Sequence, residues 1–469
     1  MPDKYHIKTQ PVPARRPRIG KVGVVDWRED CANCHNCVKK ACVFDRYREE
    51  TSYIRGLREM DAVFFQCMGC FSCVQQCTKG LLSLSPNTVY ERLGNTYWTP
   101  QILETTWAQA ETAKIPVSGA GYRGRFSGPG FDSMWTDMSE IVRPTRDGIH
   151  GREYISTAVD IGRKPALLHF DAGNPAGGLP PLVDIPMPMI IDMMPHGYRL
   201  PNLLPIIKIV AAQTGIIAIV DWKDWHLAGN DLGQYLPNLA IFLDSSAPVP
   251  GRELVSKMRL IEISDDGNAK RRIEELKKIN PDIVIAVRVE MDSGGIERAV
   301  EYARKPFIEV LHLVADINGN EIGEKRPRFI KDMVRRVHNS LVESGIRNEV
   351  TLMAGGGIAL PEHMAKQIIC GADLVTIEVP LLIALECTAC TDCNDGRSCP
   401  AKIGEIDFKY GVGRMTNLIA AWHDQLIEVM GAMGIREVRR LRGEVGRALF
   451  FEDLEEATFG KLFGSRKNS

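Results

Sequence analysis

Three tight groups hold twelve of the thirteen cysteines in this chain, and no other feature constrains its fold as strongly. The groups are Cys31, Cys34, Cys37 and Cys42; Cys67, Cys70, Cys73 and Cys77; and Cys387, Cys390, Cys393 and Cys399. The second group reads C-x2-C-x2-C-x3-C, a spacing that gives three thiolates to one iron–sulfur cluster and the fourth to a neighbouring cluster. The first group has one extra residue in its last gap. Two such units in tandem predict two 4Fe–4S clusters in a ferredoxin-like module.

Exchange of the fourth cysteine between the two units predicts the ligand sets. One cluster would be held by Cys31, Cys34, Cys37 and Cys77, and the other by Cys67, Cys70, Cys73 and Cys42. Val43 and Thr78 stand where such units usually have proline. Zinc and disulfides are the alternatives. Zinc favours pairs of C-x2-C and leaves a third cysteine in each group unused, while disulfide frameworks are typical of small secreted chains.

The third cysteine group is looser and reads C-x2-C-x2-C-x5-C, followed by Pro400. Three of its thiolates would hold a 3Fe–4S cluster, and all four would hold a 4Fe–4S cluster. Cys370 stands alone in an apolar stretch, so we interpret it as a small buried hydrophobic residue rather than a ligand.

Length and charge set the class of protein. The chain has 469 residues, enough for two or three domains, and a formal net charge of −1, which provides no basic field for nucleic acid. No apolar run reaches the roughly 18 residues of a membrane-spanning helix. Residues 1–20 lack the apolar core of a signal peptide. Abundant free thiolates indicate a reducing compartment, so we expect a cytoplasmic protein.

Composition divides the chain into five segments. We expect an extended arm at 1–25, the ferredoxin-like domain at 26–90, a linker rich in glycine and proline at 91–150, a barrel with the third cysteine group at 151–415, and a helical tail at 416–469. Glycine-rich stretches such as 118–130 cannot form a regular helix or a central strand.

From residue 151, short apolar segments alternate with amphipathic ones. Strands buried on both faces read as continuous apolar runs, as in a parallel sheet, and about eight β/α units suit a closed (β/α)8 barrel. A doubly wound open sheet is the alternative. Helices are expected at Ala269–Lys278, Gly295–Arg304 and Phe329–Glu343. Strands are expected at Ala166–Phe170, Met189–Asp192, Ile216–Val220, Ala240–Asp244, Arg259–Ile263, Ile283–Val289, Val310–Val314, Val350–Ala354 and Leu374–Ile377.

Glycines mark a candidate phosphate site late in this series. Gly355, Gly356 and Gly357 follow one predicted strand and precede a helix that begins at Pro361, and Gly371 and Ala372 accompany the next strand. Glycines after late barrel strands let backbone N–H groups approach a phosphate. Beside a third iron–sulfur cluster, this pattern indicates FMN, because a flavin can split electron pairs for one-electron carriers.

Three stretches resemble the FMN-dependent glutamate synthase family, in the archaeal-type form that carries a ferredoxin module in front. They begin with SGPGFDSMW at 127, VTLMAGGGIALPEHM at 350 and MGAMGIREVRRLRGE at 430, and the resemblance covers roughly residues 26–462. It implies an α/β fold with an FMN-binding (β/α)8 TIM barrel, an N-terminal dicluster ferredoxin-like domain and a helical C-terminal tail. It also implies reduction of 2-iminoglutarate, formed from 2-oxoglutarate and ammonia.

The resemblance also implies roles for individual residues. Gly355, Gly356, Gly357, Gly371 and Ala372 would hold the FMN phosphate. Cys387, Cys393 and Cys399 would hold a three-iron cluster, which Cys390 would complete to a cubane. Arg288 stands where the family commonly has lysine near the flavin, His338 and Asn339 stand where it has His-Gln, and Asp316 lies in the segment that replaces its glycine-rich substrate loop.

These departures leave two hypotheses. The first is a glutamate synthase-like oxidoreductase acting on a small-molecule substrate, fed by a redox partner protein or a flavoprotein subunit, with a separate glutaminase subunit as a further possible partner. The second is an electron-transfer subunit of a larger redox complex that keeps FMN and the clusters without glutamate chemistry. Either would work as an oligomer or complex. Further polar residues at predicted strand ends are candidates for testing: Asp316, Glu321, His312, Asp292 and His196.

Overall fold

The computed structural model describes residues 5–16, 19–26, 41, 43, 69–115, 130–136, 155–168, 170–171, 174–175, 180–195, 201–229, 232–390, 392–395 and 397–464. Contacts divide the chain into two units. The larger, called the barrel unit here, comprises Met1–Val12, Thr105–Cys387 and Thr391–Ser469, and the smaller comprises Pro13–Glu104 and Thr388–Cys390.

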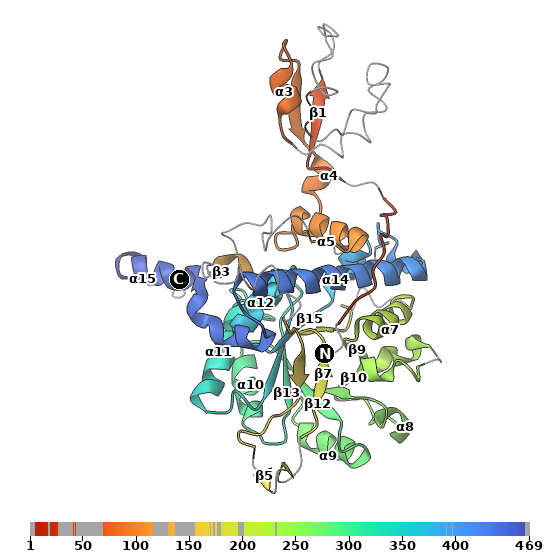
Figure 1. The fold of residues 1–469 in the computed structure, drawn as a ribbon, viewed down its shortest axis with the longest axis vertical. Coiled ribbons are helices and arrows are strands. Elements are labelled where there is room, and N and C mark those ends of the chain that lie inside the picture. The colour runs from red at the N-terminus through yellow and green to blue at the C-terminus, as the bar shows by residue number, and fades with distance from the viewer. Residues whose placement is uncertain are drawn as a thin grey trace. The chain divides into compact units, whose positions relative to one another are not determined.

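Eight parallel strands close into the barrel of the larger unit (Figure 1). In chain order they are β8 (Met189–Ile191), β9 (Ala218–Asp221), β10 (Leu239–Leu243), β11 (Leu260–Ser264), β12 (Val284–Glu290), β13 (Val310–Val314), β14 (Thr351–Gly355) and β15 (Leu374–Ile377). The last strand, β15, pairs with the first, β8. The closed (β/α)8 barrel is therefore confirmed, and the open doubly wound sheet is wrong.

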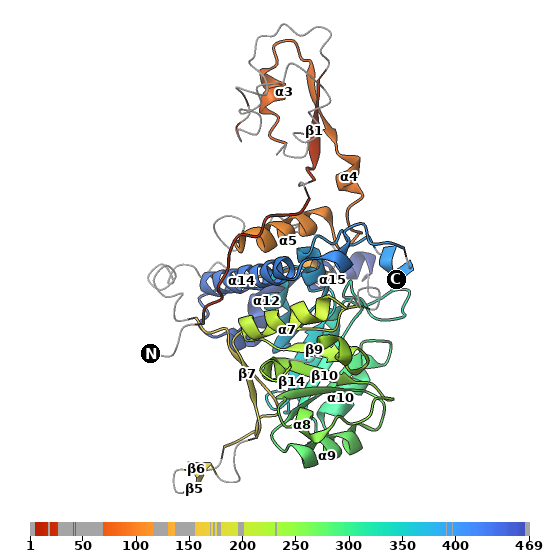
Figure 2. The same cartoon turned by 90° about the vertical axis from the view of Figure 1, so that its right-hand side faces the viewer.

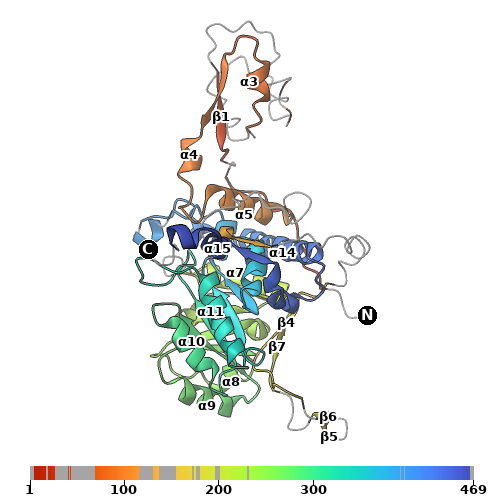
Figure 3. The same cartoon turned by 90° about the vertical axis from the view of Figure 1, so that its left-hand side faces the viewer.

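Helices surround this barrel, and Figure 3 shows α10 and α11 beside each other on its outside. The helices from α7 onward are α7 (Leu203–Thr214), α8 (Arg252–Val255), α9 (Ala269–Ile279), α10 (Gly295–Ala303), α11 (Ile330–Glu343), α12 (Pro361–Ile369), α13 (Val379–Ala384), α14 (Phe408–Ala432) and α15 (Phe451–Phe463). The three helices expected from sequence, α9, α10 and α11, begin within one residue of their predicted starts. Their apolar residues recur at helical spacing and lie buried against the strands.

One predicted barrel strand is wrong. The segment at Ala166–Phe170 contributes only its last residue to a strand, β5 (Phe170–Asp171), which pairs with β6 (Asn174–Pro175) outside the barrel. The barrel instead begins at β8. Leu167, Leu168 and Phe170 are exposed, so the apolar run was not a sign of burial at this place.

The remaining strands of the described residues form three more antiparallel pairs. They are β1 (Val22–Asp26) with β2 (Leu82–Pro86), β3 (Met134–Thr136) with β16 (Ala448–Phe450), and β4 (Val159–Ile161) with β7 (Val183–Ile185). The smaller unit also holds α3 (Ser72–Gln76) and α4 (Thr88–Glu91), and α5 (Pro100–Thr112) begins in it.

Two helices fall at the expected linker and at the start of the expected tail. Helix α5 lies inside the predicted linker, and α14 runs across the predicted boundary at residue 415. Helix α14 packs against α7 and α12 of the barrel unit (Figures 1 and 2). Among the described residues, no helix is both long and apolar enough to cross a membrane.

Candidate functional site

The carboxyl ends of the barrel strands form the mouth at which barrel enzymes carry their active sites. Four charged or titratable side chains meet just below this mouth, and we call them the tetrad: Asp192, Glu262, Arg288 and His312. Asp192 follows β8, while the others lie on β11, β12 and β13. Inward-pointing positions of a barrel are usually filled by branched apolar residues. A buried polar group of four is therefore a marked departure.

The tetrad is joined by short contacts. The Arg288 guanidinium donates to both Asp192 oxygens at 2.9 and 3.1 Å, and to Glu262 Oε2 at 3.3 Å. His312 Nδ1 lies 2.5 Å from Glu262 Oε1. His312 Nε2 lies 3.0 Å from the Thr376 hydroxyl on β15. Five strands of the barrel thus supply one hydrogen-bonded cluster.

Electrostatics favour the charged forms of Asp192 and Arg288. Burial alone would raise the pKa of Asp192, but Arg288 and then His312 outweigh it and hold that pKa below its ordinary value. The pKa of Arg288 is raised, because Asp192 and Glu262 outweigh the cost of burying its charge. The cation of Arg288 is therefore neutralised by two carboxylates inside the protein.

Ligand atoms of Asp192, Glu262 and His312 lie within 4.8 Å of one another, close enough in principle to hold a metal ion. The Arg288 guanidinium is hydrogen-bonded to both carboxylates. The arginine therefore already supplies the positive charge at this place, and the cluster is explained as an internal ion network.

Gly355, which ends β14, and the next two residues, Gly356 and Gly357, form what we call the glycine loop. This loop lies directly beside the tetrad. A Cβ on Gly355 would come within 2.3 Å of the Thr376 hydroxyl and 3.1 Å of His312 Nε2. Gly356 and Gly357 have positive φ values of 92° and 69° and pack against the 315–319 segment. This turn brings backbone to the mouth, and helix α12 begins four residues after Gly357. Backbone without side chains before a helix N-terminus fits a phosphate.

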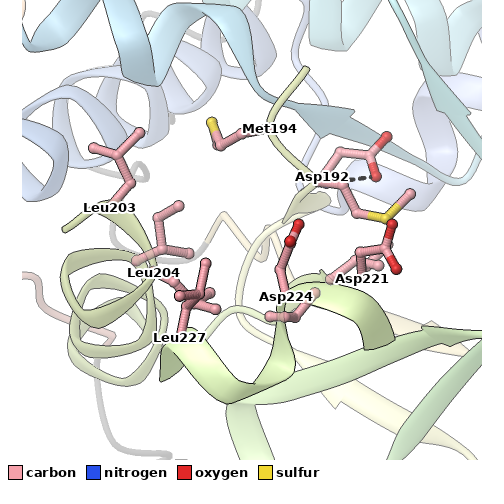
Figure 4. A pocket seen from close by; sticks show the side chains of 11 residues that line it. Asp192, Met194, Leu203, Leu204, Asp221, Asp224 and Leu227 are labelled. Atoms are coloured by element: carbon pink, nitrogen blue, oxygen red, sulfur yellow. Dashed lines mark hydrogen bonds between the residues drawn. The ribbon is translucent and has the colours of Figure 1, made fainter. Parts of the chain in front are cut away.

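A pocket opens at the same mouth, between the ends of β8 and β9 and the start of α7. Figure 4 shows the carboxylates of Asp192, Asp221 and Asp224 on one side of it and Leu203, Leu204 and Leu227 on the other. Asp221 also accepts a hydrogen bond from the backbone of Lys223 at 3.0 Å. The mouth therefore combines an acidic wall with an apolar one.

The comparisons with known proteins point to one family. Residues 327–436, which include the glycine loop and the third cysteine group, match the model described as the conserved region in glutamate synthase. The archaeal-type glutamate synthase [NADPH] of Dehalococcoides mccartyi is 25% identical, with 90% of this chain and 93% of that protein covered. The chain is similar to the archaeal-type glutamate synthases over most of its length.

The archaeal glutamate synthase [NADPH] of Archaeoglobus fulgidus is 24% identical over 93% of this chain and 96% of its own length. Among solved structures, a flavocytochrome b2 mutant with pyruvate bound is 13% identical, with a TM-score of 0.42 over 76% of this chain and 84% of its own. Similarity at that level supports no inference about function.

Several residues predicted by the family resemblance lie away from the mouth. Gly371 and Ala372 precede β15, at the amino end of the strands, whereas Gly355 ends β14 and Gly356 and Gly357 follow it at the carboxyl end. The two glycine groups therefore cannot contact one phosphate, and their grouping was wrong. The reason is that a glycine next to a strand in sequence does not reveal at which end of the barrel it lies.

His338 and Asn339 lie on the outer helix α11, not at the mouth. His338 Nδ1 accepts a hydrogen bond from Arg347 Nε at 3.0 Å, and its ring lies where a Cβ on Gly371 would be. Burial first, and then Arg347, lower the pKa of His338 to about 4. A neutral, structurally bonded imidazole near Gly371 does not meet the tetrad, so the structure removes both residues from the candidate catalytic set.

The other polar candidates have structural roles, apart from His312 in the tetrad. Asp316 follows β13 and accepts the backbone N–H groups of Asn318 and Asn320, both at 2.8 Å, which shapes the loop at the mouth. Glu321 pairs with Arg328, and Asp292 pairs with Arg298. His196 lies outside the described residues.

Sequence reasoning overlooked Asp192 and Glu262 as site residues. Glu262 was the one acidic residue within the apolar run Leu260–Ile263, and Asp192 directly follows the apolar segment Met189–Ile191. A lone acid in a strand buried on both faces needs a partner. The sequence therefore indicated that Glu262 has a buried partner, but it did not show which residue that partner is.

The described cysteines differ in their surroundings. Cys70 is exposed, Cys73 is buried and Cys77 is half-buried. Cys77 Sγ accepts a hydrogen bond from the backbone of Leu81 at 3.3 Å. Although burial acts to raise its pKa, the backbone N–H groups of residues 79–82 outweigh that and lower the pKa of Cys77. A stabilised thiolate suits an iron–sulfur ligand.

The third cysteine group is also described. Cys387 is buried, and Cys393 and Cys399 are half-buried, all three in the barrel unit, whereas Cys390 belongs with the smaller unit. Glu386 and Ala389 adopt left-handed backbone with φ of 70° and 51°. Such backbone is strained for non-glycine residues and clusters at functional sites. Cys31, Cys34, Cys37, Cys42 and Cys67 lie outside the described residues, and Cys370 is buried, as we interpreted it.

Proposed function

We propose that this chain is an iron–sulfur flavoprotein oxidoreductase of the glutamate synthase type, with FMN at the barrel mouth. One observation carries the proposal. The region that matches glutamate synthase contains both the glycine loop beside the tetrad and the third cysteine group. The candidate flavin site and the candidate cluster therefore fall within one matched segment.

The residues at the mouth have separable tasks in this proposal. Gly355–Gly357 and the N-terminus of α12 would receive the FMN phosphate. FMN, when bound, exchanges electrons in pairs with a substrate and singly with clusters. The buried tetrad would provide a rigid, charge-balanced group just below the mouth, since Arg288, Asp192 and Glu262 hold one another in place. Preorganised charges of this kind do not have to reorient during a reaction.

For the clusters, we retain the ligand assignment by spacing. The smaller unit would hold two 4Fe–4S clusters through the first two cysteine groups. Cys387, Cys393 and Cys399 would hold the third cluster as 3Fe–4S, or as 4Fe–4S with Cys390. A redox partner protein or flavoprotein subunit would exchange electrons with them, and we keep the cytoplasm as the expected location.

In the glutamate-forming version, 2-iminoglutarate takes up two electrons and two protons to give glutamate. The test uses the full chain reconstituted with FMN, iron and sulfide. Glutamate is measured after addition of a reduced one-electron carrier, 2-oxoglutarate and ammonium. Glutamate formation that depends on all three supports this version, while a fully loaded protein without turnover contradicts it.

A second candidate function is favoured by the hydrogen bonds that Arg288 makes inside the protein. A dicarboxylate substrate needs cationic partners, but Arg288 is committed to Asp192 and Glu262. The pocket at the mouth is lined by Asp192, Asp221 and Asp224 and by no lysine or arginine among the described residues. These features suit an electron-transfer subunit without glutamate chemistry. Its flavin would be reduced and reoxidised at rates that 2-oxoglutarate does not change.

A further inference from the structure

Glu378 is a buried carboxyl at the barrel mouth that neither proposed function uses. It directly follows the last strand, β15, and is the N-terminal cap residue of the short helix α13. Its exposed fraction is 8%. Within the described part of the chain, its carboxyl group has no hydrogen-bond or ion-pair partner. Buried carboxyl groups normally have such partners. Their absence at Glu378 indicates that its carboxyl group has a role in function rather than in holding the fold together.

Strand register places Glu378 beside the glycine loop. Strands β14 and β15 pair in parallel, with Ala354 opposite Val375. The segments Gly355–Gly357 and Thr376–Glu378 therefore leave the barrel at the same height on neighbouring strands. These are the seventh and eighth strands, after which barrels most often bind a phosphate group. Glu378 thus lies on the eighth-strand side of the candidate phosphate site.

The charges around Glu378 come from the first and fifth barrel strands. Asp192 donates its backbone N–H to Ile377 O at 2.9 Å, which fixes it next to Glu378. Burial first, and then the charge of Asp192, raise the pKa of Glu378 to about 8, while Arg288 acts in the opposite direction. At neutral pH the carboxyl is therefore mostly uncharged. Above pH 8 it becomes a second anion beside Asp192.

We propose that Glu378 determines which form of flavin the barrel accepts, admitting a phosphorylated flavin only while its own side chain is uncharged. The inference rests on the proposed flavin site. A flavin phosphate is a dianion at pH 7 and above, and an ionised carboxylate at the neighbouring strand end repels it. Riboflavin, which lacks the phosphate, is not subject to this repulsion. The barrel therefore binds FMN in a pH-dependent manner and riboflavin in a pH-independent manner.

The experiment measures dissociation constants of FMN and of riboflavin for the flavin-stripped full-length chain, by flavin fluorescence, near pH 7 and near pH 9. A group with a pKa of about 8 is roughly one-tenth protonated at pH 9. FMN binding should therefore weaken by about tenfold over this range, with riboflavin unchanged. In Glu378→Gln the side chain cannot ionise, so FMN should bind equally well at both pH values.

Glu309→Gln is the matched control. Glu309 is another buried carboxyl, but it directly precedes β13 at the amino end of the barrel strands and accepts hydrogen bonds from Lys277 Nζ at 2.7 Å and from the backbone N–H of Ile285 at 2.8 Å. This variant should keep the pH dependence of the unmodified chain. Loss of the pH dependence in Glu309→Gln, or its survival in Glu378→Gln, would overturn the assignment to Glu378. An equal pH response of riboflavin would overturn the role of the phosphate. If neither flavin binds at either pH, the proposed flavin site itself is wrong, and the inference falls with it.

Discussion

Replacement of Arg288 by methionine tests whether the tetrad is a charge-balanced unit. The substitution removes the partner of two carboxylates whose side chains are 4% and 0% exposed, Asp192 and Glu262. Removing one member of a buried ion pair typically costs about 3–5 kcal/mol, because the remaining charge has no compensation. Glu262 keeps its 2.5 Å contact with His312, so most of this cost should fall on Asp192.

The loss of unfolding free energy in Arg288→Met should depend on pH in a defined direction. In the unmodified chain the pKa of Asp192 is lowered, so its contribution to stability is present above the pKa of the unfolded state and is lost as pH falls through the folded-state pKa. Without Arg288, burial dominates and raises that pKa. Arg288→Met should therefore be more destabilised near pH 8 than near pH 5, where protonation of Asp192 removes the uncompensated charge.

The assay is urea unfolding followed by circular dichroism, with the barrel transition fitted separately from that of the smaller unit. Arg271→Met is the matched control, because Arg271 pairs with Glu275 on the surface of α9, where both side chains are more than a third exposed. Its cost should be about 0.2–1 kcal/mol. Asp192→Asn added to Arg288→Met should recover part of the stability. Equal losses in Arg288→Met and Arg271→Met, or a larger loss at the lower pH, would refute the reasoning.

Three further outcomes are expected. Gly355→Ala should lower unfolding free energy by about 1–3 kcal/mol, because its Cβ would lie 2.3 Å from the Thr376 hydroxyl; a thermal melt with no shift would contradict this. His338→Ala should cost about 1 kcal/mol through the lost Arg347 bond yet leave the FMN dissociation constant unchanged, and weaker FMN binding would return His338 to the site. Cys77→Ser should lower the iron and acid-labile sulfide content of the reconstituted chain by about one cluster, and full content would exclude Cys77 as a ligand.

The barrel could be predicted from sequence because its evidence is local. Strands such as Val310–Val314 and Leu374–Ile377 are continuous apolar runs, and helices such as α9 and α11 carry apolar residues at helical spacing. Each element can be recognised within a window of its own length. The stretch at 166–170 shows the limit of this evidence, since an apolar run that lies exposed looks the same in sequence as a buried one.

The candidate site could be predicted only in part, because it depends on contacts between distant strands. Arg288 and the loop Gly355–Gly357 were found from sequence, and they do lie at the mouth. His338 and Gly371 were grouped with them, but they lie together at the outer helix α11 and the amino end of β15. Closeness in sequence to a strand does not show which end of the barrel a residue occupies.

By itself the sequence determined the alternating β/α order, the cysteine spacing and the family resemblance, since each is a pattern within one stretch of chain. Only the tertiary structure decided that Asp192 from the first barrel strand, Glu262 from the fourth and Arg288 from the fifth share one buried ion network. It also placed Glu378 beside the glycine loop. Barrel closure and strand register bring these residues together, and both arise from pairing between segments up to about 190 residues apart.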